Sequence, residues 1–179
     1  MYINRIGRVG VGGVIDAQVA AGADDGGWDQ STSTFSNNSN SYAIGNYGYW
    51  HIFARWTGIT IPAGATIKNS YVQIHAGNVG VVSTHLYLND DAAPTAPTNY
   101  STANGKVKTT ANIAWVVPSA VAWAKSGDIS ALVQELLDSY GSFANGAIMM
   151  LLISDMADDG INNIDMYEAS FGAKIHIEW

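Results

Sequence analysis

The chain has 179 residues, enough for one domain that buries about 70% of the surface its unfolded form would expose. Eight Lys and Arg against 15 Asp and Glu give a net charge of −7, which excludes the basic patch that nucleic-acid binding needs. There is no cysteine, which excludes disulfides and thiolate metal sites, and no run approaches the roughly 18 apolar residues of a membrane span.

The first 15 residues are glycine-rich and mildly basic, and their alternation is too irregular for a core strand. They are either an edge strand or frayed terminus, or an arm that pairs with the sheet edge of a neighbouring subunit. Two arginines in a chain of net negative charge favour docking onto an acidic copy of the same chain or onto an acidic partner. The candidate docking residues are Tyr2, Ile3, Arg5, Ile6 and Arg8. No secretory signal is visible here, so we expect the protein to be made in the cytoplasm and to stay inside the producing cell.

The next elements are short strands around one long loop. We expect a strand over residues 15–21, followed over residues 24–41 by a polar loop whose length favours an exposed, functional segment. Strands over residues 42–46 and 49–57 follow. In the second of these, apolar side chains at 50, 52, 54 and 56 share one face, as a half-buried antiparallel sheet requires.

A turn and a second strand come directly afterwards. Pro62 cannot donate to a strand ladder and Gly64 tolerates a positive φ, so the strands end there. Residues 67–76 resume the alternation, with Val72, Ile74 and Ala76 on one face. We expect further strands over residues 81–88 and within 106–117, separated by a connection that contains Pro94 and Pro97.

One amphipathic helix is predicted over about residues 128–140. Asp128 is the expected N-cap, apolar residues recur at steps of three and four, and Gly141 is the stop signal. The following stretch, residues 147–153, is apolar on both faces, so either this helix or a neighbouring subunit must cover its outer side. Two last strands, over residues 164–170 and 173–179, close the chain.

About ten short strands with a single helix predict an all-β fold, a jelly-roll β-sandwich. We therefore expect one sandwich domain over residues 16–179, preceded by the arm over residues 1–15. Charged residues are only 13% of the chain, so the surface is largely neutral. Either Ser, Thr, Asn and Gly solvate it, or other protein chains cover part of it.

Several motifs together resemble a known family. They are Ala21-Gly-Ala-Asp-Asp-Gly-Gly-Trp28, Phe53-Ala-Arg-Trp56 with Ile59-Thr-Ile-Pro-Ala-Gly-Ala-Thr-Ile67, Asp91-Ala-Ala-Pro-Thr95, Thr109-Thr-Ala-Asn-Ile-Ala-Trp115 and Asp128-Ile-Ser-Ala-Leu-Val-Gln-Glu135. In these, the chain resembles the DNRLRE-type domains, carbohydrate-binding-module-like jelly rolls of prokaryotic surface proteins and phage structural proteins. The literal motif that names the group is missing, and residues 1–15 lie outside the match. The resemblance implies a sandwich and a role in binding or assembly, without implying a reaction.

Two acidic turns are candidate calcium sites, because carboxylates beside glycine can supply the oxygens that this cation takes. One turn contains Asp24 and Asp25, and the other contains Asp155, Asp158 and Asp159. Neither has the spacing of an EF-hand, and ordinary solvated turn carboxylates are the alternative. No other cofactor is expected.

Aromatic residues near the polar loop are candidate sugar contacts, namely Trp28, Tyr47 and Tyr49. The alternative for these rings is packing in the core. The four histidines, His51, His75, His85 and His176, all fall on the polar phase of their strands, so neighbouring strands could present them together. They could be metal ligands, but there is no His-x-His pair. The alternative is that they are surface or interface histidines.

No catalytic pattern is present, since there is no nucleophile elbow, phosphate-binding glycine loop or cysteine nucleophile. We expect a non-enzymatic structural protein of a tailed-phage virion: a capsid decoration or cement protein, or a tail or fibre component. Its partners would be itself, as a dimer or trimer, and other virion proteins. The alternative is a carbohydrate-binding module, with or without calcium. Neither nucleic acid nor membrane is an expected partner.

Overall fold

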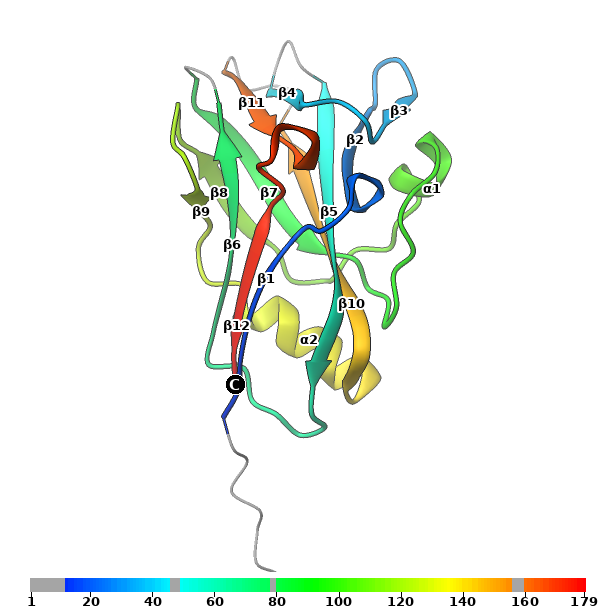
Figure 1. Cartoon of the computed structure of the whole chain (residues 1–179), viewed down its shortest axis with the longest axis vertical. Coiled ribbons are helices and arrows are strands. Elements are labelled where there is room, and N and C mark those ends of the chain that lie inside the picture. The colour runs from blue at the N-terminus through cyan, green and yellow to red at the C-terminus, as the bar shows by residue number, and fades with distance from the viewer. Residues whose placement is uncertain (1–11, 46–48, 78–79, 156–159) are drawn as a thin grey trace, which may run out of the picture.

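The chain folds as two antiparallel sheets packed face to face, so the expected all-β sandwich is confirmed (Figure 1). The structure is a computed structural model, and it describes residues 12–45, 49–77, 80–155 and 160–179. Sheet 1 has the order β1 (Val14–Gln18), β12 (Lys174–Glu178), β6 (Asn69–Ala76), β11 (Ile161–Asp165) and β4 (Ser41–Gly45), and β9 (Ala124–Lys125) also pairs with β6. Sheet 2 has the order β3 (Thr34–Ser36), β2 (Asp25–Asp29), β5 (Trp50–Ile61), β10 (Phe143–Ser154), β7 (Val82–Leu88) and β8 (Ile113–Val117).

The chain changes sheet repeatedly, from β3 to β4, from β4 to β5, from β5 to β6 and from β6 to β7. Such crossings are typical of a jelly roll. They put the expected apolar phase of each strand between the sheets. Ile52, Ala54 and Trp56 of β5 are buried there, and the Trp56 indole nitrogen donates to the carbonyl of Ala173, 2.9 Å away.

The turn after β5 is confirmed. Gly64 has a φ of +74°, and the amide of Ala65 donates to the carbonyl of Pro62 at 3.2 Å. Strand β6 begins at Asn69, two residues later than expected. The amide of Ile67 donates to the side-chain oxygen of Gln134 instead of to a strand partner, whereas the amide of Lys68 already donates to the carbonyl of Glu178 in β12 at 2.8 Å.

The predicted amphipathic helix is α2 (Ser130–Tyr140), which closes the lower end of the sandwich in Figure 1. It buries Leu132, Val133, Leu136 and Leu137 in the main core. Ile129 occupies the N-cap position, not Asp128, although the Asp128 carboxylate still accepts the amide of Ser130 at 2.9 Å. Gly141 ends the helix with a φ of +81°. Within the described residues, no helix has the length and apolar character needed to cross a membrane.

The outer side of β10 is covered by neither of the two predicted candidates. A short helix that the sequence analysis did not predict, α1 (Tyr100–Asn104), lies over this side of sheet 2 (Figure 1). We call the resulting cluster the second core. Its buried members are Trp28, Phe53, Ala103, Met149 and Leu151. The apolar residues on both faces of β10 are therefore buried by other parts of the same chain.

Candidate binding surfaces

The structure moves the boundary of the proposed arm. Residues 14–18 form β1, an edge strand of sheet 1, and Gly13 exchanges two hydrogen bonds of 3.0 Å with Trp179. The folded body therefore includes Gly13, and an arm can consist only of residues before it. The predicted docking residues Tyr2, Ile3, Arg5, Ile6 and Arg8 lie outside the described residues.

The predicted sugar platform is wrong for Trp28. Its ring lies on β2 beneath α1 and is only 1% exposed, so neither face is open to a ligand. It packs edge-on against His51 with a centroid separation of 5.2 Å. Tyr49 is 38% exposed, and Tyr47 lies outside the described residues. The motif around Trp28 thus serves packing, because α1 covers it.

The first acidic pair is engaged within the protein. Both the Nε and the Nη2 atom of Arg55 contact the Asp24 carboxylate, Nε at 2.7 Å, and Nη1 of Arg55 donates to the carbonyl of Pro94 at 3.1 Å. Asp25 accepts the amide of Tyr167 at 2.9 Å, while its other oxygen has no partner among the described residues. Burial raises the pKa of Asp25 to about 7, so its carboxyl group is a poor anionic ligand at and below neutral pH.

The second acidic turn does not join the first. Asp25 lies opposite Ala54, and Ala54 lies opposite Met150, which places these three residues in one row of sheet 2. Asp155 is five residues beyond Met150 along the chain, or about 16 Å at the rise of a strand. Asp158 and Asp159 lie outside the described residues. Among the residues that the structure describes, no three or more potential metal ligands cluster together.

The four histidines separate into different environments. His51 is 3% exposed under the 30–33 turn, contrary to the expected surface position, and burial lowers its pKa to about 4. Its Nδ1 accepts the amide of Ser154 at 3.1 Å, which makes Nε2 the donor to Gln30, 2.9 Å away. His85 lies on sheet 2 beside Asn112. Only His75 and His176 share a surface, the outer face of sheet 1.

The outer face of sheet 1 carries a packed array of polar and aromatic side chains. In its first row, Asp16, His176 and Tyr71 are cross-strand neighbours on β1, β12 and β6. The His176 imidazole lies 2.8 Å from the Asp16 carboxylate and stacks on Tyr71 with a centroid separation of 4.7 Å. The ammonium of Lys125 lies 3.5 Å from the centre of the Tyr71 ring. Each ring in this row is therefore held by at least two neighbours.

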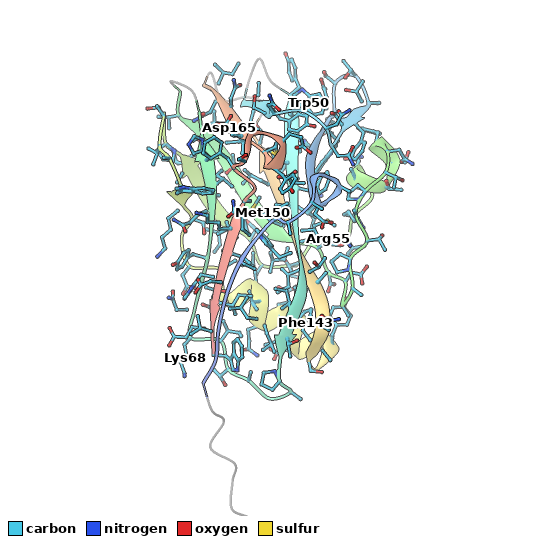
Figure 2. All side chains as sticks on the ribbon, in the orientation of Figure 1. Trp50, Arg55, Lys68, Phe143, Met150 and Asp165 are labelled. Atoms are coloured by element: carbon cyan, nitrogen blue, oxygen red, sulfur yellow. The ribbon has the colours of Figure 1, made fainter. Side chains whose placement is uncertain are left out.

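A second group on the same face centres on His75 of β6. Its Nδ1 lies 2.7 Å from the carboxylate of Asp165, which Figure 2 labels, and its ring stacks on Phe171 at 3.9 Å. Trp123 meets His75 edge-on at 5.9 Å, and the Lys174 ammonium lies 3.4 Å from the centre of one Trp123 ring. A shallow hollow of about 240 Å³ lies at the first row and reaches Lys174 of the second group; it is lined by Asp16, Ala17, Gln18, Gln73, Lys174, Ile175 and His176.

The sequence analysis put His75 and His176 on the polar phase of their strands, and alternation along β6 and β12 places Tyr71 and Lys174 with them, but it assigned no binding role to the outer face of sheet 1. Trp123 and Phe171 lie outside regular strands, so no period shows that they return to the same face. Chemically, the face offers aromatic rings that neighbouring side chains hold in place, together with charges of both signs.

No protein-family model matches the chain, and no curated protein is significantly similar to it in sequence. Its function therefore has to be inferred from the surfaces themselves.

Proposed function

We propose that this protein is a non-enzymatic structural subunit of a tailed-phage virion, a capsid decoration or cement protein or a tail or fibre component. It would act through protein–protein contacts as a symmetric dimer or trimer and with other virion proteins. The observation that carries the proposal is that the outer face of sheet 1 is continuous with the strand to which the proposed arm is joined. This strand is β1, and its residues Asp16 and Gln18 are part of the face.

The outer face of sheet 1 suits a protein partner for an energetic reason. Tyr and Trp are enriched among the residues that dominate interface affinity. Here their side chains are already fixed by His176, Lys125 and Lys174, so little rotamer entropy remains to be lost on association. A rigid, mixed-charge surface beside an edge strand favours a specific contact with another subunit.

The first test compares oligomeric states by size-exclusion chromatography with light scattering. We expect the full chain to form a dimer or trimer and a variant lacking residues 1–11 to be monomeric. The truncation stops before Gly12 so that the pairing of Gly13 with Trp179 is retained. Monomers in both samples, or unchanged oligomers in the truncated variant, would contradict a docking arm.

The second test addresses the outer face of sheet 1. Lys125→Glu reverses an exposed charge over Tyr71, and we expect it to weaken self-association at least tenfold in dilution experiments. Lys108→Glu is the matched control, because Lys108 is equally an exposed lysine but lies beside Tyr87 of sheet 2. Equal effects of both reversals, or none of either, would exclude the outer face of sheet 1 as the interface.

Carbohydrate binding is the alternative function that the sequence favours. Trp28 cannot support this alternative, because its ring is buried. A sugar would need a different surface, one that has solvent-exposed aromatic rings.

A further inference from the structure

We propose that a groove between the 30–33 turn and α1 binds a neutral saccharide. This site goes beyond the assembly role and shares no residue with the outer face of sheet 1. The groove has a volume of about 700 Å³ and is lined by Ser33, Phe35, Thr98, Asn99, Tyr100, Ser101 and Thr102. Ligand sites commonly have volumes of about 300–1,000 Å³, so this groove has room for a short stretch of a sugar chain.

Two aromatic rings give the groove its apolar surface. Phe35 stacks on buried Phe53 with a centroid separation of 6.0 Å and an interplanar angle of 11°, and Tyr100 packs against the same second core. Both rings are only partly buried, so each keeps an open portion. Sugar rings carry flat patches of C–H groups that pack on aromatic faces and edges, which is the contact these two rings can make.

The polar groups of the groove match a ligand rich in hydroxyls. The side-chain hydroxyls of Ser33, Thr98, Tyr100 and Ser101 form no hydrogen bond within the described residues. Each hydroxyl can both donate and accept, as the hydroxyls of a sugar also do. The groove therefore offers several adaptable hydrogen-bonding partners around two ring surfaces.

The absence of charge among the seven lining residues narrows the ligand class to neutral sugars. A uronate, sialylated or phosphorylated sugar would lose hydration on entering and would meet no cationic side chain to compensate for that loss. Neutral hexose or pentose polymers carry no such cost.

The groove is held in shape by hydrogen bonds on both of its sides. On the α1 side, Asn99 accepts the amide of Thr102 at 3.0 Å and Thr102 in turn accepts the amide of Asn99 at 3.1 Å. On the other side, the Asp29 carboxylate accepts the amides of Ser31 and Thr32 at 2.7 and 3.1 Å. A ligand therefore meets walls that are already ordered, which reduces the entropic cost of binding.

The test is affinity electrophoresis of the full chain in gels that contain a neutral polysaccharide (dextran, mannan, xylan or galactan) or an acidic one (polygalacturonate or hyaluronate). We expect retardation by at least one neutral polymer and by neither acidic one. Ser101→Glu adds a carboxylate inside the groove without removing a core contact, and we expect it to lower the apparent affinity at least tenfold. Ser139→Glu, on the exposed side of α2, is the matched control and is expected to bind like wild type.

A second variant addresses the rings. Tyr100→Ala is expected to reduce retardation, whereas Tyr140→Ala, which removes a tyrosine that is 41% exposed on α2, is expected to leave it unchanged. Circular dichroism checks that Tyr100→Ala remains folded. The proposal is overturned if no neutral polymer retards the protein, if only acidic polymers do, or if Ser101→Glu binds as tightly as wild type. Because a monomer can bind sugar, these outcomes are independent of the oligomeric state that tests the assembly role.

Discussion

Asp25 and His51 are buried titratable residues whose charges respond to pH in opposite ways. Asp25 has a folded-state pKa of about 7 against an ordinary value of 3.8, because burial disfavours its carboxylate. His51 has a folded-state pKa of about 4 against an ordinary value of 6.5, because burial disfavours its imidazolium. Each therefore links folding to proton binding, with opposite sign.

The signs follow from which state binds more protons. Between about pH 4 and 7 the folded protein holds a proton on Asp25 that the unfolded chain has released, so the stabilising contribution of Asp25 falls as pH rises. Between about pH 4 and 6.5 the unfolded chain protonates His51 and the folded protein does not. The contribution of His51 is therefore complete above pH 6.5 and is lost as pH falls toward 4. In the shared window the two slopes cancel.

We therefore expect Asp25→Asn to expose the slope due to His51. Relative to wild type, the free energy of unfolding of this variant should rise from pH 4.5 to 6.5 by on the order of 2 kcal/mol, since one pKa unit corresponds to about 1.4 kcal/mol. Urea denaturation at a series of pH values measures this difference. His51→Gln should show the opposite slope relative to wild type. Variants whose curves run parallel to wild type would contradict the opposed pair.

At the scale of elements, β10 is buried on both of its faces, each by a different core. Leu152 faces the main core between the sheets, and its neighbour Leu151 faces the second core under α1. Both side chains are at most 1% exposed. A sheet whose two faces are both covered by its own chain is a three-layer arrangement at this point, with α1 and its flanking loops as the third layer.

We expect Leu151→Ala and Leu152→Ala to destabilise the protein by similar amounts, about 2–5 kcal/mol each, because both leave a cavity in a packed interior. Chemical denaturation of the two single variants measures the comparison. A cost below about 1 kcal/mol for Leu151→Ala alone would mean that α1 does not seal the outer side of β10 in solution.

The elements that the sequence predicted are those whose pattern is local. Alternation at Ile52, Ala54 and Trp56 reports burial directly, and the spacing of apolar residues in α2 does the same for a helix. Helix α1 was missed because its five residues are too short for a period to appear, and its only apolar anchors are Tyr100 and Ala103. Trp28 was misassigned for the same reason, since the segment that buries it was not recognised.

At the scale of the whole molecule, the two candidate binding surfaces lie on different sheets. The outer face of sheet 1 is made by side chains from β1, β6, β9, β11 and β12, together with Trp123 and Phe171. The groove lies beside sheet 2 and is made by the 30–33 turn, Phe35 of β3 and the chain around α1. The sequence predicted the sandwich between them and the outward phase of His75 and His176, but it did not assemble either surface, because both are built from segments far apart in the chain. Tyr71 and His176 illustrate this, since their rings stack although the two residues lie 105 positions apart in the sequence.

The hydrogen-bonded pair of Gly13 and Trp179 places Gly13, just before β1, directly beside Trp179, just after β12. The Trp179 ring also packs against Gly13 so closely that a side chain at this position would collide with it. Topologically, the body is nearly a closed loop, with its opening at one corner of sheet 1. A reporter or affinity tag fused after Trp179 would therefore emerge next to the proposed arm and compete with it for space, whereas an insertion at the turn around Gly64, where a Cβ would meet nothing within 4 Å, would leave that corner free.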